Sequence, residues 1–444
     1  MPSTPTVWLT TLGCAKNQVD SEKVEVMLGE AGYRLAESPD AADVVMVNTC
    51  AFIEEAREES VDTILEMQDT KRGDAHTVVI GCMAQRFGTD VAEALPEVDA
   101  ILGLDRYGEL VGTLDRLTGF GGNTVQLGTD IRRRPKMDIL NVVHRPAPEF
   151  PYAYVKVAEG CDKPCTFCAI PLIRGKQRSR RPTEIRDEVA GLVGAGVKEV
   201  VLVAQDLAAY GRDIDAPGSG IVDLLRFCSD VAGLDVFRLL YLYPKEIRPS
   251  LIEEMASNPK IATYFDLSLQ HASVDLLRAM RRPGGADRYV DLLDQIRAAA
   301  PDAATRSSFI VGFPGETEAQ VEELAEFLET AQLDWAGFFP YSPEPGTPAA
   351  ELDGRVDREE INERLRYLQS VQEEITYEAN SAMVGETLPT LVDQIEDGVA
   401  VGRSWREAPE IDGVITLDRG EPGEWVDATI TAVVGTDLEA TVRA

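Results

Sequence analysis

The stretch VKVAEGCDKPCTFCAIP at residues 155–171 places three cysteines, Cys161, Cys165 and Cys168, within eight residues. The apolar run Ala153–Val157 just before them predicts a buried strand, so the three thiols lie on the loop that follows its carboxyl end. Thiolates in a C-x3-C-x2-C pattern can hold three irons of a cubane cluster and leave the fourth iron without a local protein ligand. The sequence therefore predicts an iron–sulfur site whose open iron can bind a further molecule.

Zinc is the main alternative for this cysteine loop. A structural zinc site needs a fourth ligand and normally uses paired C-x2-C spacing. The three histidines, His76, His144 and His271, do not stand at zinc-knuckle spacing. A group of free structural cysteines is the other alternative. The spacing favours an iron–sulfur site over both.

Outward from the loop, apolar runs alternate with amphipathic segments through residues 151–380. Six short runs are expected to be strands: Ala153–Val157, Glu199–Val203, Val236–Leu242, Tyr264–Leu269, Ser307–Val311 and Trp335–Phe339. A succession of β/α repeats predicts a barrel or partial barrel of the TIM type, with its chemistry at the carboxyl ends of the strands.

A separate parallel α/β region is predicted in residues 1–135. Expected strands over 7–12, 43–48 and 77–80 are each followed almost at once by a cysteine, namely Cys14, Cys50 and Cys82. Carboxyl ends of parallel strands lie on one edge of a sheet, so these thiols should meet although 36 and 32 residues separate them in sequence. Three buried cysteines acting as small hydrophobes are the alternative. The repeated placement favours a second three-thiolate cluster site.

Two further segments complete the expected domain organisation. A basic, proline-punctuated stretch from Arg132 to Pro148 predicts a linker, assigned to residues 136–150. Residues 381–444 contain five short β-rich runs separated by Gly, Pro and acidic turns, which predict a small antiparallel β-barrel of the OB type. The expected runs are Thr387–Asp393, Val399–Arg403, Gly413–Leu417, Trp425–Val433 and Leu438–Val442.

Segment 155–171, with Phe167 directly before the last cysteine, resembles the radical S-adenosylmethionine signature. The resemblance implies that the open iron chelates S-adenosylmethionine and that reduction of the cluster yields a 5′-deoxyadenosyl radical. With the second three-cysteine site and the terminal barrel, called TRAM, essentially the whole chain is similar to the methylthiotransferase family. That similarity implies two 4Fe-4S clusters, and sulfur delivery at the auxiliary cluster held by Cys14, Cys50 and Cys82. It also implies methyl transfer from a second cofactor molecule, and an electron donor such as flavodoxin or ferredoxin.

The family has a branch that modifies adenosine in tRNA and a branch that modifies the β-carbon of an aspartate in the twelfth small-subunit ribosomal protein. Four segments resemble the ribosomal-protein branch: residues 11–22, 169–175, 178–182 and 270–273. Residues 384–444 carry 13 acidic residues against four arginines. An acidic barrel favours a basic protein partner over nucleic acid. The tRNA activity, and an iron–sulfur electron-transfer or scaffold protein, remain the alternatives.

Residues beyond the six cysteines are assigned by looser resemblance. Five are expected to contact the cofactor: Phe167, Gln205, Gln270, Arg306 and Gly312. Gln205 ends the second expected barrel strand but lacks the Gly-Gly-Glu form seen in many radical enzymes. Structural polar roles are the alternative for Gln270 and Arg306, and a plain turn is the alternative for Gly312. The seventh thiol, Cys228, lies in an apolar helical stretch and is expected to be core.

Composition limits the class of protein. The chain has a formal charge of −33 on 444 residues, with 44% hydrophobic and 27% charged residues, which is ordinary for a globular protein. The acidity disfavours a protein that grips phosphate backbones through a general basic surface. No run of about 18 apolar residues predicts a membrane span, and the first eleven residues do not form a secretory signal. A cytoplasmic, reducing location is expected, with thiols available as metal ligands.

Overall fold

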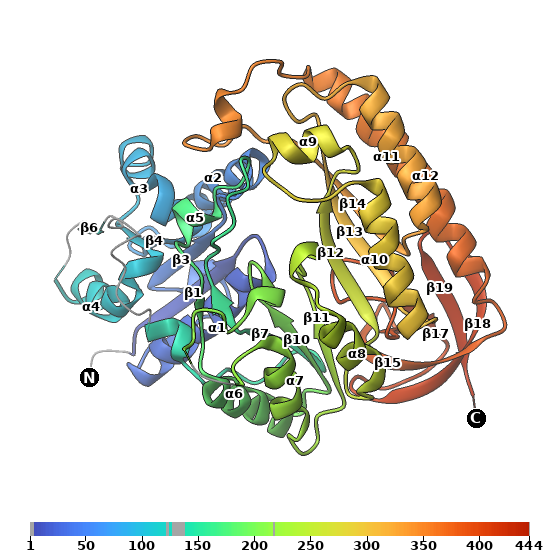
Figure 1. The fold of residues 1–444 in the computed structure, drawn as a ribbon. Coiled ribbons are helices and arrows are strands. Elements are labelled where there is room, and N and C mark those ends of the chain that lie inside the picture. The colour runs from blue at the N-terminus through green and yellow to red at the C-terminus, as the bar shows by residue number, and fades with distance from the viewer. Residues whose placement is uncertain (1–3, 121–123, 127–137, 216–217, 444) are drawn as a thin grey trace. The chain divides into compact units, whose positions relative to one another are not determined.

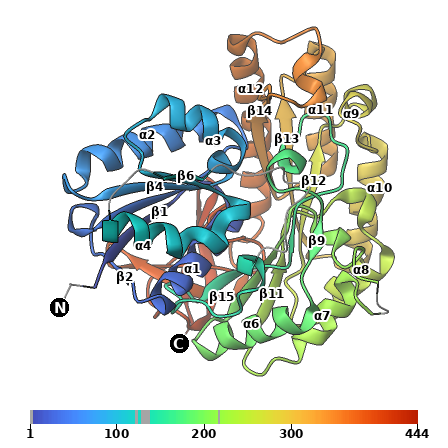
Figure 2. The same ribbon diagram turned by 90° about the vertical axis from the view of Figure 1, so that its left-hand side faces the viewer.

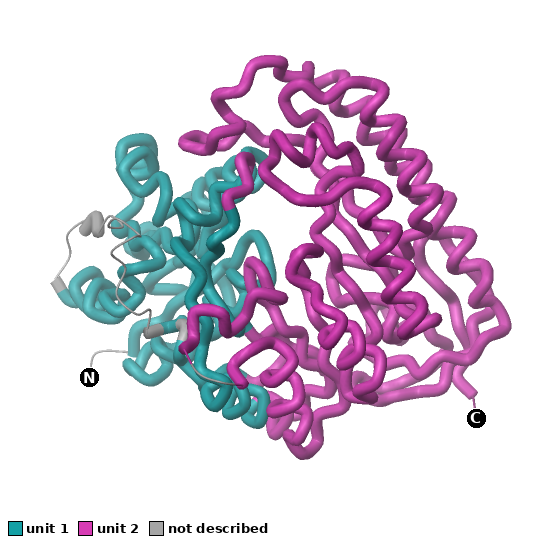
Figure 3. The backbone as a smooth tube through the Cα atoms, in the orientation of Figure 1, with its two compact units in different colours: residues 1–146, 156–163, 168–191 teal, residues 147–155, 164–167, 192–444 magenta. Residues whose placement is uncertain are grey.

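A computed structural model describes residues 4–120, 124–126, 138–215 and 218–443 of the chain. The basic stretch Arg132–Pro135, at the start of the predicted linker region, lies outside the described residues. The chain forms two compact units (Figure 3): unit 1 comprises residues 1–146, 156–163 and 168–191, and unit 2 comprises 147–155, 164–167 and 192–444. Of the helices within the described ranges, none combines the length and the apolar character needed to cross a membrane.

Unit 1 contains a six-stranded parallel sheet in the order β2-β1-β3-β4-β5-β6. Its strands are β1 (Thr6–Thr11), β2 (Arg34–Leu35), β3 (Val44–Thr49), β4 (His76–Gly81), β5 (Ala100–Gly103) and β6 (Thr124–Gln126). Its α-helices are α1 (Ala15–Glu30), α2 (Glu54–Thr70), α3 (Cys82–Ala94), α4 (Leu110–Phe120) and α5 (Ile170–Ile173). Short 3-10 turns lie at Pro39–Ala41, Leu104–Glu109 and Asp138–Asn141, and a two-stranded ribbon joins β8 (Ala158–Glu159) to β9 (Arg178–Ser179).

The central strands β3 and β4 of this sheet are buried almost throughout, because helices cover both faces. Figure 2 shows α2 and α3 on one side of the sheet and α1 and α4 on the other. The three strands predicted from the apolar runs are confirmed, with bounds shifted by about one residue. The short strands β2, β5 and β6 were not predicted from sequence, since runs of two to four residues carry little periodicity.

Unit 2 begins with an arc of strands (Figure 1). Strands β11-β10-β7 form one sheet and β12-β13-β14 another, and the bridges Phe237–Ile261 and Leu242–Leu267 join the two. The strands are β7 (Tyr152–Lys156), β10 (Glu199–Val203), β11 (Val236–Leu239), β12 (Tyr264–Gln270), β13 (Ala304–Val311) and β14 (Trp335–Pro340). The six expected strands are thus present, and the architecture is a partial barrel.

Helices alternate with these strands, as β/α repeats require. They are α6 (Pro182–Gly194), α7 (Ile221–Ser229), α8 (Pro249–Ser257), α9 (Val274–Ala279), α10 (Ala286–Ala299), α11 (Glu318–Ala331) and α12 (Arg358–Ser381). Residues 182–191 of α6 belong to unit 1. Helices α10, α11 and α12 lie along the outer side of β12–β14 (Figure 1). Short 3-10 turns lie at Leu207–Ala209, Pro244–Glu246 and Pro348–Glu351.

A closed five-stranded barrel ends the chain, in the order β15-β16-β17-β19-β18. The strands are β15 (Thr387–Glu396), β16 (Val399–Arg403), β17 (Ile415–Leu417), β18 (Trp425–Val434) and β19 (Asp437–Val442). The five predicted strands are confirmed. One pair, β17 with β19, is parallel rather than antiparallel. A closed ring with an odd number of strands cannot alternate direction throughout, so closure itself requires a parallel pair.

Buried ion pairs within unit 2 fix the terminal barrel to the partial barrel. Glu199 of β10 accepts from Arg238 of β11 at 2.5 Å and from Arg403 of β16 at 2.8 Å. Arg403 also binds Asp393 of β15, with Oδ1 at 2.9 Å. Arg238 donates onward to the carbonyl of Trp405 at 2.7 Å. These charges are at most a few per cent exposed except Asp393 at 8%, and each has an opposite partner, as buried charges require.

Candidate iron–sulfur and cofactor sites

Cys14, Cys50 and Cys82 follow neighbouring strands of the unit 1 sheet. Cys50 comes directly after β3, Cys82 comes directly after β4 and begins α3, and Cys14 stands three residues beyond the end of β1. Strand β3 pairs with β1 on one side and with β4 on the other. The three thiols therefore meet at one edge of the sheet, as the strand-and-cysteine pattern predicts.

Two glycines allow the chain to turn tightly between strand and cysteine. Gly13 and Gly81 have φ of +92° and +95°, a region that favours glycine. A Cβ at Gly13 would lie 2.9 Å from the Sγ of Cys50, and one at Gly81 would lie 2.6 Å from the carbonyl oxygen of Thr49. The glycines thus leave the space in which the thiols approach each other.

The three thiols differ in pKa because their electrostatic surroundings differ. Burial raises the pKa of Cys50 to about 12, helped by the neighbouring thiols of Cys82 and Cys14. Burial also raises the pKa of Cys82, although Arg174 opposes the shift. At Cys14 burial is outweighed by the positive charges of Lys16 and Arg174 and by backbone N–H groups, so its pKa is lowered. Cys14 is therefore the thiol that loses its proton first, and metal binding would favour the thiolate at all three.

A buried group of polar side chains lies beside these thiols, and the sequence pattern did not reveal it. Arg174 donates to Cys82 Sγ at 3.3 Å and to Asn17 Oδ1 at 2.6 Å with one terminal nitrogen. Its other terminal nitrogen donates to Glu159 and Asp20. A signal was available, because each of these residues lies within a segment that carries the family resemblance. No spacing rule, however, joins positions about 150 residues apart.

Two buried thiols, Cys50 and Cys82, and the half-buried thiol of Cys14 lie at this edge. Such a set fits a cluster that takes its protein ligands from cysteine. Across the described ranges, no three His, Cys, Asp or Glu side chains are arranged to hold a single metal ion. In a cubane cluster each thiolate binds a different iron, so the three sulfurs need not converge on a single metal position.

The cysteine loop after β7 contributes residues to both units. In unit 1, Cys161 follows Gly160, whose φ is +80°, and a Cβ there would lie 2.6 Å from the carbonyl oxygen of Gly175. The backbone N–H of Cys161 donates to that same carbonyl at 3.0 Å. Cys161 is buried and Cys168 is half-buried. The loop is therefore held against the segment that follows α5.

In unit 2, Cys165 is half-buried, and its Sγ accepts from Arg282 Nη1 at 3.4 Å. The guanidinium of Arg282 also lies over the ring of Tyr243, 4.3 Å from its centroid. Thr166 anchors the next position, because its backbone N–H donates to Met280 at 3.1 Å and its hydroxyl donates to Ala279 at 2.9 Å. Phe167 follows and is half-buried.

Three of the expected cofactor residues lie at or just beyond strand ends in unit 2. Gln205 follows β10, Gln270 is the last residue of β12 with φ of +76°, and Gly312 follows β13. All three belong to the carboxyl side of the arc, where α/β barrels place their chemistry. The N–H of Gly312 donates to Glu316 at 2.8 Å, and Ile361 packs where a Cβ would stand. That turn is therefore stabilised by its own chain.

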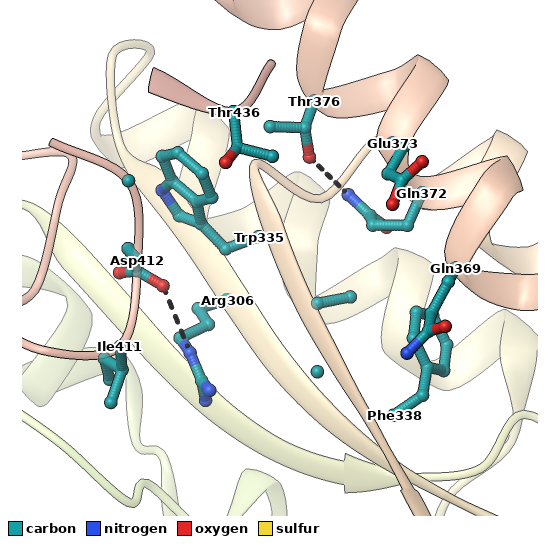
Figure 4. Close-up of a pocket in the computed structure, with 13 residues that line it drawn as sticks. Arg306, Trp335, Phe338, Gln369, Gln372, Glu373, Thr376, Ile411, Asp412 and Thr436 are labelled. Carbon is teal, nitrogen blue, oxygen red and sulfur yellow. Dashed lines mark hydrogen bonds and ion pairs between the residues drawn. The ribbon is translucent and has the colours of Figure 1, made fainter. Parts of the chain in front are cut away.

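Arg306 occupies a different position. It is the third residue of β13, so about six residues, or about 20 Å of strand, separate it from Gly312. It donates to Asp266 at 3.0 Å and lies 3.3 Å from Asp412. Figure 4 shows Arg306 and Asp412 facing each other in a cavity of about 390 Å³ that Trp335 and Thr376 also line. The structure thus does not bring Arg306 to the strand ends where Gln205, Gln270 and Gly312 lie.

Two other residues noted in the sequence have structural partners. His271 is fully buried, with Nδ1 accepting from the backbone of Ser273 at 3.0 Å and Nε2 3.4 Å from Glu316. Cys228 is buried in α7, as its apolar surroundings predict.

Comparisons with known proteins agree with this arrangement. Residues 6–103 match the family described as uncharacterized protein family UPF0004, residues 155–328 match the radical SAM superfamily, and residues 384–442 match the TRAM domain. Among solved structures, the radical S-adenosylmethionine methyltransferase TsrM from Kitasatospora setae, with cobalamin and a 4Fe-4S cluster bound, is similar with a TM-score of 0.58. The match covers 78% of this chain and 77% of TsrM at 15% identity, so it supports the fold alone.

Similarity in sequence goes further. The ribosomal protein uS12 methylthiotransferase RimO of Streptomyces griseus is 42% identical, over 99% of this chain and 98% of that protein. The protein of the same name from Saccharopolyspora erythraea is 41% identical over 97% and 94%, and that from Cutibacterium acnes is 40% identical over 98% and 97%. With three matched domains and relatives of this identity along its whole length, the chain belongs to the ribosomal protein uS12 methylthiotransferase (RimO) family.

Proposed function

We propose that this protein is a radical S-adenosylmethionine methylthiotransferase that adds a methylthio group to the β-carbon of an aspartate in ribosomal protein uS12. The observation that carries the proposal is the meeting of Cys14, Cys50 and Cys82 at one sheet edge, in a chain that also has the C-x3-C-x2-C loop. An ordinary radical enzyme needs only the loop. A second cysteine site supports a reaction that consumes sulfur as well.

Six thiols are proposed as ligands of two 4Fe-4S clusters: Cys161, Cys165 and Cys168 for one, and Cys14, Cys50 and Cys82 for the auxiliary one. When bound, the clusters and S-adenosylmethionine would supply radical formation, sulfur and methyl group. The chain itself orients the cysteine loop through Thr166 and Gly160, and it buries Cys50 and Cys82 of the auxiliary set.

Contacts to the cofactor are proposed for the residues around the strand ends. Gln205, Gln270 and Gly312 have the support of their position on the carboxyl side of the arc, and Phe167 has the support of its place in the cysteine loop. Arg306 has less support, because it lies near the opposite end of β13 and already binds two carboxylates.

The surface of the terminal barrel supports a basic protein substrate. Of its four arginines, Arg403 and Arg406 are buried in ion pairs, which leaves Arg419 and Arg443 exposed. Nine acidic residues of the barrel are exposed: Glu386, Glu396, Asp397, Glu410, Asp418, Glu421, Glu424, Asp427 and Glu439. The acidic excess therefore lies at the surface, where it attracts basic partners and repels phosphate.

The two aromatic residues of this barrel are engaged elsewhere in unit 2. Trp405 donates its indole N–H to the carbonyl of Asp302 at 3.0 Å, and Trp425 donates to Asp235 at 3.1 Å. Single-strand readers instead combine a positive groove with aromatic platforms. The barrel thus supports the ribosomal-protein activity over the tRNA activity. An electron donor such as flavodoxin or ferredoxin, and a cytoplasmic location, are part of the same proposal.

The test uses full-length protein reconstituted anaerobically with iron and sulfide. Reductant and S-adenosylmethionine are added with a peptide from the aspartate loop of uS12 in one arm and a tRNA anticodon stem-loop in the other. Mass spectrometry then follows the gain of one methylthio group. Gain on the peptide alone is expected. Gain on the RNA alone would overturn the substrate, and cofactor cleavage with no gain on either would discard both substrates.

A further inference from the structure

Arg174 links the segment after the cysteine loop to the auxiliary cysteines. It stands six residues after Cys168, directly after the short helix α5, where its backbone N–H donates to Ile170 at 2.7 Å. Its side chain is 2% exposed. A fully charged guanidinium is costly to bury, so its position must be maintained by the groups it contacts.

The guanidinium is shared between two kinds of partner. Nη1 donates to Glu159 Oε1 at 2.7 Å and to Asp20 Oδ2 at 3.1 Å. Nη2 donates to Asn17 Oδ1 at 2.6 Å and to Cys82 Sγ at 3.3 Å. Because the guanidinium is planar, binding of Nη1 to two carboxylates also fixes the direction in which Nη2 donates. Here that direction is toward a thiol proposed as a cluster ligand.

The surrounding charged groups balance the positive charge of Arg174, while its guanidinium stays in contact with the Cys82 thiol. Lys156 binds Asp20 and also donates to Glu159 at 2.7 Å, so two cations face two carboxylates. All four side chains are at most 2% exposed. Because the four charges already cancel, the thiolate of Cys82 adds a negative charge next to a donor that can stabilise it.

Asn17 holds the second partner of Nη2 in place. Its side-chain amide donates to the carbonyls of Leu12 at 2.8 Å and Thr49 at 3.1 Å, which lie at the ends of β1 and β3. Its Oδ1 is thus turned toward Arg174. The same turns that bring Cys14 and Cys50 to the sheet edge therefore also orient the arginine.

We propose that Arg174 is a positioning residue of the auxiliary cluster, whose N–H···S hydrogen bond to Cys82 raises the reduction potential of that cluster. Hydrogen bonds to cluster sulfurs stabilise the more negative, reduced state, and so they tune the potential. This inference rests on the proposed function, because it takes Cys82 as a ligand. It goes beyond that function by assigning control of the cluster to a residue outside the cysteine set.

The test isolates the auxiliary cluster in a parent protein carrying Cys161→Ala, Cys165→Ala and Cys168→Ala. Iron content and electron paramagnetic resonance establish whether the parent binds a cluster, and a redox titration gives its potential. Because Arg174→Gln alone leaves two carboxylates facing Lys156, the main variant is Arg174→Gln with Glu159→Gln, which keeps the buried charge balanced. Glu159→Gln alone serves as its partner measurement.

At a fixed potential, the double variant is expected to show about a tenfold lower ratio of reduced to oxidised cluster than Glu159→Gln alone, a shift of 59 mV for one electron. Arg174→Lys should restore only part of the lost reduction potential, because an ammonium group keeps the charge of the guanidinium but not its planar fork of donors. Arg145→Gln with Glu22→Gln is the matched control, since the Arg145 side chain is equally buried at 2% exposure and binds Glu22. Glu188, the other partner of Arg145, keeps Lys23 and Arg180. The cluster of this control should keep the parent potential.

The outcomes separate the two proposals. A parent that binds no cluster overturns the auxiliary site, and with it the role of Arg174. A parent with a cluster whose potential is the same in the Arg174 variants overturns the role of Arg174 alone. An equal shift in the Arg145 control also overturns it, because the potential would then respond to any loss in the buried charge network.

Discussion

Cys161, Cys165 and Cys168 come from one loop of eight residues, whereas Cys14, Cys50 and Cys82 come from three strand ends spread over 69 residues. The first set is held together by the covalent chain. The second exists only once β1, β3 and β4 have paired. A site of the second kind is a product of the tertiary fold, so it depends on packing around it in a way that the loop does not.

The two sets also differ in the environment that the fold supplies. At Cys82 the donor is Arg174, which is held by carboxylates and is shielded from solvent. At Cys165 the donor is Arg282, which lies over the ring of Tyr243 and is 8% exposed. The auxiliary site is therefore the more demanding structure, because its ligands, glycines and counter-charges depend on one another.

The largest expected effect separates the two sets by function. Cys165→Ala should abolish cleavage of S-adenosylmethionine, because it removes a ligand of the cluster proposed to bind the cofactor. Cys50→Ala should leave cleavage intact and abolish methylthiolation of the peptide. Chromatography of 5′-deoxyadenosine and mass spectrometry of the peptide measure the two outputs in the same reaction. Normal sulfur insertion by Cys50→Ala would show that the auxiliary set is not a sulfur site.

A second prediction concerns the glycines that shape the auxiliary edge. Gly81→Ala forces an alanine to φ of +95° and brings its Cβ to 2.6 Å from the Thr49 carbonyl, so unfolding free energy should fall by about 2–3 kcal/mol or more. Iron content should fall with it. Gly29→Ala in α1 is the control, since open space surrounds that site and stability should rise by about 0.5–1 kcal/mol. Equal iron loss in both variants would remove any special role for Gly81.

The strands and cysteines of both sites were predictable from the sequence, but the charged residues around the auxiliary cysteines were not. Strands and thiols were predictable because each strand is a short apolar run that a cysteine follows almost immediately. Arg174, Asp20 and Glu159 were not, because they are brought together by pairing of segments about 150 residues apart, and no periodicity reports that. Arg306 was predictable only in its place along the chain. It directly precedes the expected strand Ser307–Val311, but its ion pair with Asp412 did not follow from the sequence.

The third prediction concerns the stability that depends on a buried ion pair of unit 1, that of Lys23 with Glu188. Lys23 lies 3.1 Å from Glu188 and is fully buried. Burial lowers the pKa of Lys23 from 10.5 to about 7, opposed by Glu188 and reinforced by Arg180, Arg145 and Lys156. Between these values the unfolded chain binds more protons than the folded one, so stability from this residue rises with pH.

Compared with Lys23→Met, the wild-type protein should therefore gain about 2 kcal/mol of unfolding free energy between pH 7.5 and pH 9.5. Urea unfolding at the two pH values measures the difference, and the thiols titrate alike in both proteins. Glu188 keeps Arg180 and Arg145 in the variant, so the change does not leave it unpaired. A difference that stays flat over this pH range would contradict a depressed pKa at Lys23.

The smallest expected effect concerns the acidic surface of the terminal barrel. Neutralising Glu421, Glu424 and Asp427, all exposed on or next to β18, should weaken binding of the basic uS12 peptide by about 0.2–1 kcal/mol for each charge at low salt. The effect should appear in KM and not in kcat, and it should vanish near 1 M salt, where screening acts within about 3 Å.

The matched control neutralises Glu58, Glu59 and Glu66, exposed on α2 of unit 1, and removes the same number of charges. If that control raises KM equally, attraction comes from the net charge of −33 on the whole chain, and the barrel has no special part in recognising the substrate. A rise confined to the barrel variant would instead assign substrate attraction to unit 2, apart from the unit that holds the auxiliary thiols.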